Sequence, residues 1–333
     1  MLPIQVEDIG KMKILCLHGM GTNADIFRAQ TASFRSLLPS YYTFYFPEGE
    51  YECAAADGIA EVYPGPYLCW YPFPPTLDHL SEAHELIWNI IEEDGPFDGV
   101  MGFSQGAALA ASILLHHEKN TPLETPPFRF AIFICASLPF SVDQTSGFEL
   151  TQVFTYSGDP MPGDLNRWQD LVNREQLTDQ KPNNEPFQLD AQELQSFVEP
   201  ISRASSSNNI AATNSSSSYS DSDSVSTEDT TLSDNCSLGD GEEVPLSVNT
   251  NGTRIFRFHP EVDTVRISIP TAHVYGKNDP YLSQSVQLVN MSQLDLVRAM
   301  DHGGAHDIPR SNSVTKAIAD TIEKTIMKSE FMI

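Results

Sequence analysis

Residues 97–106 read Phe97-Asp98-Gly99-Val100-Met101-Gly102-Phe103-Ser104-Gln105-Gly106, and this stretch decides the fold. The apolar residues 99–101 predict a strand, and the alanine-rich residues 107–111 predict a helix directly after it. Between them, residues 102–106 match the pattern G-x-S-x-G. In this context the pattern is typical of a sharp strand-to-helix turn that holds a serine hydroxyl above a sheet. We therefore predict that Ser104 is a catalytic nucleophile; an N-cap serine without a chemical role is the alternative.

The chain around this turn alternates short apolar runs with longer amphipathic stretches. We expect strands over 13–17, 42–46, 98–102, 128–136, 265–275 and 294–300. Helices are expected over 23–38, 78–93, 105–116 and 313–327. Strands that alternate with helices predict a mostly parallel central sheet covered by helices on both faces. Together with the serine turn, this pattern predicts the α/β-hydrolase fold.

One polar segment interrupts the pattern. Residues 205–245 are dominated by Ser, Thr, Asn and Asp, with four serines in a row at 215–218. Such a segment cannot bury enough apolar surface to offset its ordering entropy, so we predict a disordered insertion. A tolerated surface loop is favoured over a regulatory element. Because the α/β pattern resumes beyond it, we predict a single domain over 11–333 that contains the insertion.

Composition excludes several classes of partner. The formal net charge is −26, with 45 acidic against 19 basic residues, which would repel nucleic acid and anionic membrane surfaces. The sequence does not show the pattern of a secretory signal, which is a cationic stretch followed by an apolar one. No apolar run approaches the roughly 18 residues that span a bilayer. We therefore expect a cytoplasmic protein. The five cysteines are an odd number without CxxC spacing, which argues against disulfides and a zinc site.

A serine nucleophile needs a base that is oriented by a carboxylate, and in this fold the acid precedes the histidine in the chain. Asp279 follows the strand expected over 265–275, in a turn shaped by a glycine and a proline. His302 and His306 both follow the last expected strand; we favour His306, because the glycines before it allow a loop to reach Ser104. Asp279 is preferred as the acid over three competitors, Asp295, Asp301 and Asp307.

The first expected strand ends in a glycine-bearing loop, residues 17–23. Hydrolases of this fold hold the tetrahedral oxyanion with two backbone N–H groups, one of them on the residue after the nucleophile. We predict that these donors belong to Met20 and Gln105. A nucleotide site is disfavoured, because the loop lacks G-x-G-x-x-G.

An aromatic stretch lies between the second expected strand and its helix. Tyr67, Trp70 and Tyr71 are candidates for the wall of an apolar acyl pocket, with Tyr63 and Phe73 beside them. Plain core packing is the alternative. Prolines in this stretch leave few backbone donors and favour an ordered loop that acts as a lid.

Together, these motifs resemble the FSH family of serine hydrolases, which is best populated in fungi. The resemblance covers about residues 11–140 and 265–327 and is carried by five blocks, at 17–23, 67–71, 97–106, 275–280 and 302–309. It implies a triad of Ser104, Asp279 and His306 without a metal or organic cofactor. The family usually has glycine before its catalytic histidine, whereas this chain has Ala305.

Within the family, the chain resembles esterases and thioesterases of fungal polyketide pathways. That resemblance implies a small acyl ester or a carrier-protein-bound acyl thioester as substrate, and a polyketide synthase as partner. The enzyme would release a finished acyl chain or trim acyl groups from an intermediate. The alternative is a non-catalytic hydrolase-fold protein that binds a ligand, which the complete set Ser104, Asp279 and His306 disfavours.

Overall fold

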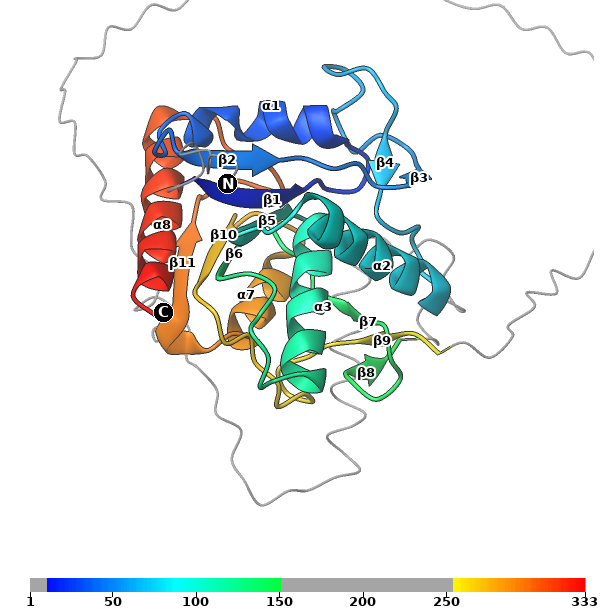
Figure 1. Ribbon diagram of the computed structural model, residues 1–333. Coiled ribbons are helices and arrows are strands. Elements are labelled where there is room, and N and C mark those ends of the chain that lie inside the picture. The colour runs from blue at the N-terminus through cyan, green and yellow to red at the C-terminus, as the bar shows by residue number, and fades with distance from the viewer. Residues whose placement is uncertain (1–10, 151–253, 333) are drawn as a thin grey trace, which may run out of the picture. The chain divides into compact units, whose positions relative to one another are not determined.

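A six-stranded parallel sheet forms the centre of the computed structural model, which describes residues 11–150 and 254–332 (Figure 1). The strand order is β11-β10-β6-β5-β1-β2, and every neighbouring pair is parallel. The strands are β1 (Met12–Leu17), β2 (Tyr42–Tyr45), β5 (Gly99–Phe103), β6 (Phe130–Ile134), β10 (Thr271–Tyr275) and β11 (Val297–Asp301). The predicted parallel sheet is confirmed.

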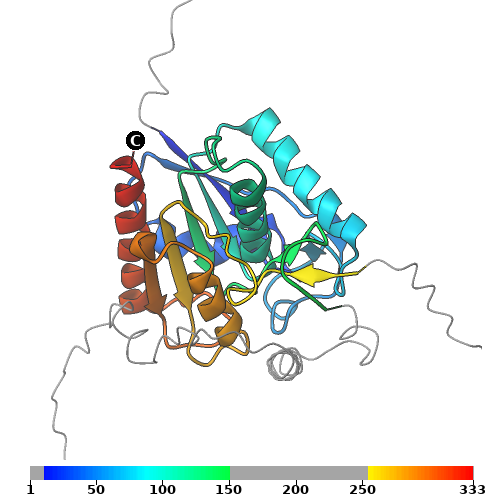
Figure 2. The same cartoon turned by 90° about the horizontal axis from the view of Figure 1, so that it is seen from below.

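Helices cover both faces of this sheet (Figures 1 and 2). On one face, α1 (Ala24–Arg35) and α8 (Asn312–Glu330) pack on residues such as Ile14, Met101 and Ile132. On the other face, α2 (Leu77–Asp94), α3 (Gln105–Asn120) and α7 (Leu282–Asn290) pack on Leu15 and Val100. Neighbouring residues of one strand point to opposite faces, so β5 and β6, which are buried on both faces, consist of apolar residues and glycine. The predicted α/β-hydrolase fold is confirmed.

Two small antiparallel sheets and the helix α7 were not predicted. β3 (Tyr51–Glu52) pairs with β4 (Leu68–Cys69), and β9 (Phe256–Arg257) pairs with both β7 (Phe140–Ser141) and β8 (Phe148–Glu149). Two-residue strands are too short to show a period in the sequence. The strand expected over 265–275 is shorter than predicted, because only β10 joins the sheet. A 3₁₀ turn, Leu294–Leu296, precedes β11.

The starts of the helices differ in how they are capped. Asn23 caps α1 by accepting the N–H of Ile26 at 2.8 Å, and Thr76 caps α2 through a capping box with His79. Ser104 precedes α3 but makes no capping hydrogen bond with its side chain. The hydroxyl of Ser104 is therefore available for other contacts.

The insertion predicted at 205–245 lies outside the described residues, and the single domain over 11–333 stays a prediction. Helices in the described ranges are all too short or too polar to cross a bilayer.

Candidate active site

The turn between β5 and α3 forces Ser104 into a strained backbone conformation. Its φ is 51° and its ψ is −114°, in a region that residues with a side chain rarely occupy. A Cβ on Gly102 would lie 2.4 Å from the Ala107 nitrogen, and one on Gly106 would lie 2.3 Å from the Leu17 oxygen. Only glycine fits at either position. The close packing of this turn therefore explains both glycines of the G-x-S-x-G pattern.

The structure brings together Ser104, His306 and Asp279, named the candidate triad below. His306 Nε2 lies 2.9 Å from Ser104 Oγ, and His306 Nδ1 lies 2.9 Å from Asp279 Oδ2. The Asp279 side chain is fully buried, and its other oxygen accepts the N–H of Tyr281 at 2.7 Å. In this geometry His306 Nε2 can take the hydroxyl proton while the carboxylate holds Nδ1–H.

Two aromatic rings fix the imidazole of His306. The centre of the imidazole lies 5.2 Å from the centre of the Phe103 ring and 4.9 Å from the centre of the Tyr281 ring. Sequence reasoning did not identify Tyr281 as a site residue. The only sequence signal was an aromatic residue two positions after the predicted acid, which is too common to carry weight.

His302, the alternative base, is bonded within its own loop. It is buried, its Nδ1 accepts the N–H of Gly304 at 3.2 Å, and its Nε2 lies 3.5 Å from Cys135 Sγ. Burial lowers the pKa of His302, so its ring is neutral near neutral pH. Of the competing acids, Asp301 accepts the N–H groups of Lys277 and Gly303, which shapes the same loop. The carboxylate hydrogen-bonded to His306 is that of Asp279.

The two predicted oxyanion donors flank the nucleophile turn. In the described residues, neither the Met20 N–H nor the Gln105 N–H is used in a hydrogen bond. A Cβ on Gly19 would lie 3.4 Å from the Cβ of Ser104, so the loop that carries Met20 lies against the serine. Both donors are thus free to bind an oxygen beside Ser104.

The aromatic stretch is tied to this turn by the side chain of Gln105. Gln105 Oε1 accepts the N–H of Trp70 at 2.9 Å, and Nε2 donates to the carbonyl of Tyr71 at 2.7 Å. Trp70 is fully buried, and its indole N–H donates to the carbonyl of His18 at 2.8 Å. Trp70 therefore packs beneath the loop of Met20 instead of facing solvent.

The other two residues predicted for a pocket wall are placed differently from each other. Tyr71 is buried, with its ring 6.1 Å from that of Phe140 in an edge contact. Tyr67 is half-buried, and its hydroxyl donates to the carbonyl of Tyr63 at 2.8 Å. These contacts leave part of Tyr67 exposed on the loop.

Cys135, Asp279 and His306 offer ligand atoms within 4.8 Å of one another, which is close enough for a metal ion. Burial raises the pKa of the Cys135 thiol well above its usual range, and a metal prefers the thiolate. The Asp279 and His306 atoms already bond to each other. This donor set suits proton transfer to and from Ser104 better than metal binding.

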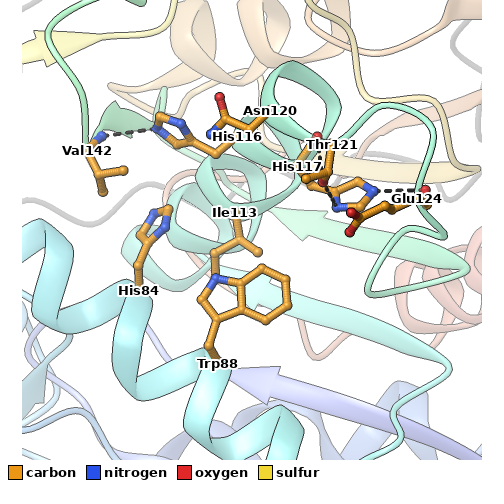
Figure 3. A pocket seen from close by; sticks show the side chains of 9 residues that line it. All are labelled: His84, Trp88, Ile113, His116, His117, Asn120, Thr121, Glu124 and Val142. Atoms are coloured by element: carbon orange, nitrogen blue, oxygen red, sulfur yellow. Dashed lines mark hydrogen bonds between the residues drawn. The ribbon is translucent and has the colours of Figure 1, made fainter.

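A cavity of about 400 Å³ lies between α2 and α3, away from the candidate triad (Figure 3). His116, in its wall, follows Ser104 by twelve residues along α3, which corresponds to about 18 Å at the rise of an α-helix. Figure 3 shows His84 and Trp88 of α2 facing Ile113 and His116 of α3. The lining residues are His84, Trp88, Ile113, His116, His117, Asn120, Thr121, Glu124 and Val142.

A parallel α/β sheet with a strained serine at a strand-to-helix turn defines a serine hydrolase of the α/β-hydrolase class. The family model described as Serine hydrolase (FSH1) matches residues 8–161 and 224–318. The chain belongs to this family, so the predicted family and the predicted hydrolase class of enzyme are confirmed.

Several fungal proteins are similar to this chain. Esterase alnB of Emericella nidulans is 31% identical over 322 residues, which cover 96% of this chain and 98% of the relative. Hydrolase FUB4 of Gibberella moniliformis is 27% identical over 319 residues, covering 95% of this chain and 99% of the relative. Among solved structures, the monoacylglycerol lipase of Paleococcus ferrophilus is 12% identical with a TM-score of 0.44, covering 95% of this chain and 94% of that one.

Proposed function

We propose that this serine hydrolase cleaves a carboxylic ester or thioester through an acyl-enzyme on Ser104. The observation that carries the proposal is the unbroken hydrogen-bond chain from Ser104 Oγ through His306 to buried Asp279, with both links at 2.9 Å. The relative alnB, which aligns over nearly the whole chain, is named an esterase. That name supports an acyl substrate.

The proposed reaction begins when Ser104 Oγ attacks the acyl carbonyl carbon and His306 Nε2 takes the hydroxyl proton. Asp279 stabilises the imidazolium that forms, and the N–H groups of Met20 and Gln105 bind the oxyanion. Each such donor is commonly worth about 2.7–4 kcal/mol of barrier. His306 then protonates the leaving alcohol or thiol, and water cleaves the acyl-enzyme by the reverse sequence of proton transfers.

For the biological role, we propose the release or trimming of an acyl chain in fungal secondary metabolism, in the cytoplasm. The substrate is then a small acyl ester or an acyl thioester on the carrier domain of a polyketide synthase. The support is the resemblance of the motifs to fungal polyketide-pathway enzymes, together with fungal relatives that span nearly the whole chain. No described feature favours the non-catalytic alternative.

The test is kcat/KM for one medium-length acyl group presented as an oxygen ester and as a pantetheine thioester, with Ser104→Ala as the control. A thioester preference that Ser104→Ala abolishes supports release from a carrier protein. An ester preference supports a trimming esterase. Equal, negligible rates in wild type and Ser104→Ala would contradict hydrolysis at this site.

A further inference from the structure

Arg257, on β9, is a buried cation that contacts neutral groups. The residue is 4% exposed. Its Nε donates to the carbonyl of Leu138 at 2.9 Å, its Nη2 donates to Gln284 Oε1 at 2.5 Å, and its guanidinium lies 5.1 Å from the centre of the Phe140 ring. Among the described residues, no carboxylate pairs with it. Buried charges are normally paired, because desolvation of an unpaired one is costly.

The guanidinium of Arg257 keeps donors to spare. Burial lowers the pKa of Arg257 to about 10, so the group is still charged near neutral pH. A guanidinium has five N–H donors, of which Leu138 and Gln284 take two. Both hydrogens of Nη1 and one of Nη2 have no acceptor in the described part of the chain. These hydrogens form the end of the fork that matches the two oxygens of a carboxylate.

Arg257 is connected to the candidate site through Phe140 and Tyr71. The guanidinium lies 5.1 Å from the centre of the Phe140 ring, and that ring makes an edge contact with the ring of Tyr71 at 6.1 Å. The Tyr71 carbonyl accepts the side-chain N–H of Gln105, directly after the nucleophile, and the Tyr281 ring lies 4.9 Å from that of His306 in a tilted contact. These contacts place Arg257 on the side of the candidate triad where Tyr71 lies.

We propose that Arg257 binds a carboxylate on the acyl part of the substrate, at the end remote from the bond that is cleaved. This inference rests on the proposed function and narrows its substrate class to acyl groups that carry an acid. Holding β9 to Leu138 and Gln284 explains two donors of Arg257 but not a buried charge that no carboxylate of the described residues balances. A planar anion supplies both the missing acceptors and the missing charge.

The test uses p-nitrophenyl half-esters of succinic, glutaric, adipic and suberic acid, each compared with the same compound whose free carboxyl is methyl-capped. At the chain length that reaches Arg257, wild type should have a kcat/KM about 10- to 100-fold higher for the free acid, as expected for a hydrogen-bonded ion pair. Arg257→Gln should abolish that ratio while the methyl-capped ester is still hydrolysed. Arg257→Lys, which keeps the charge but not the fork, should retain part of it.

Two outcomes of these kinetics overturn the anion site as a whole. One is a wild-type ratio of free acid to methyl ester that does not exceed one at any chain length. The other is an equal loss of both rates in Arg257→Gln, which is the result expected of a purely structural arginine. If Arg257→Gln instead changes only the ratio between phosphopantetheine and pantetheine thioesters, the anion belongs to the leaving group, and the assignment to the acyl part is wrong.

A binding measurement separates this proposal from the proposed function. Calorimetry on Ser104→Ala compares monomethyl adipate with dimethyl adipate, without any reaction. Tighter binding of the half-acid that disappears in Ser104→Ala combined with Arg257→Gln supports the anion site even if wild type hydrolyses neither ester class. Equal binding of both compounds, in an enzyme that does hydrolyse the neutral ester, overturns the anion site and leaves the proposed function standing.

Discussion

A Ser-His-Asp set lies near each end of helix α3, and the two sets differ in geometry and burial. The candidate triad lies at its N-terminus, with two contacts of 2.9 Å. Near its C-terminus, Ser141, His116 and Asp143 form a second group, named the far-end set. There His116 Nε2 lies 3.3 Å from Ser141 Oγ, and Nδ1 lies 3.6 Å from Asp143 Oδ2. Residue types alone therefore do not identify the reactive set.

The two sets differ in the solvent exposure of the serine and in whether the histidine Nε2 has a lone pair free to accept a proton. Ser141 is fully buried, whereas Ser104 is partly exposed and the His306 side chain is 25% exposed. The lone pair of His116 Nε2, which a general base needs, already accepts the N–H of Val142 at 3.1 Å. His116 therefore joins α3 to the segment after β7. The far-end set is a structural network in which the serine is buried away from solvent.

Asp143 also serves the structure of this network. Its carboxylate accepts two hydrogen bonds from Lys119, at 3.1 and 3.3 Å, and one from the N–H of Thr145. Partial burial alone would raise the pKa of Asp143, but the bonds from Thr145 and Lys119 outweigh it and lower the pKa to about 2. An ionised Asp143 thus holds the end of α3, whereas Asp279 holds a histidine.

The largest expected difference between the sets is in the serines. Ser104→Ala should lower kcat/KM for an activated ester by about 10⁴-fold or more, because it removes the nucleophile. Ser141→Ala should leave kcat/KM nearly unchanged. Steady-state kinetics on both variants, with circular dichroism to verify folding, makes this comparison. A similar loss in both variants would contradict the assignment of the nucleophile.

The second-largest expected difference is between the acids of the two sets, Asp279 and Asp143. Asp279→Asn should lower kcat/KM by about 10³- to 10⁴-fold, because an amide no longer holds the useful tautomer of His306. Asp143→Asn is the matched control, in which the same change removes an ion pair and should lower the free energy of unfolding by up to about 1 kcal/mol. Kinetics and urea unfolding of both variants measure these effects. Full activity in Asp279→Asn would disprove its role as the orienting acid.

The smallest expected effect concerns pH and stability at the far end. Burial lowers the pKa of His116 to about 4 and that of His84 to about 3. A histidine in the unfolded chain has a pKa of 6.5. At pH values between 6.5 and the lowered pKa, the unfolded chain therefore binds protons that the native state does not. Stability is therefore present above about pH 6.5 and falls as pH falls, by about 1.4 kcal/mol per pH unit for each histidine.

His116→Gln should make that dependence shallower by about one histidine's share, because glutamine does not titrate. Urea unfolding of wild type and His116→Gln from about pH 7 to about pH 5 tests this expectation. The same pH dependence in both proteins would mean that His116 is already protonated in the native state.

Sequence patterns predicted the layers of the fold and most of its long elements. The helices expected over 23–38 and 78–93 correspond to α1 and α2 within a few residues, because strong apolar periods and capping residues mark their limits. α7 and the two small sheets were missed. Their short lengths give no period, and contacts between distant segments, such as β9 with β7 and β8, decide that they form.

The sequence by itself determined the nucleophile turn, because its strand, two glycines, serine and helix are contiguous and their local packing permits little else. Only the tertiary structure decided which histidine and which carboxylate lie beside it, since His306 is 202 residues from Ser104 and loops bring them together. The tertiary structure likewise decided the burial and the hydrogen-bond partners of Arg257 and Trp70. Burial and partners depend on segments far apart in the chain, and no local pattern records them.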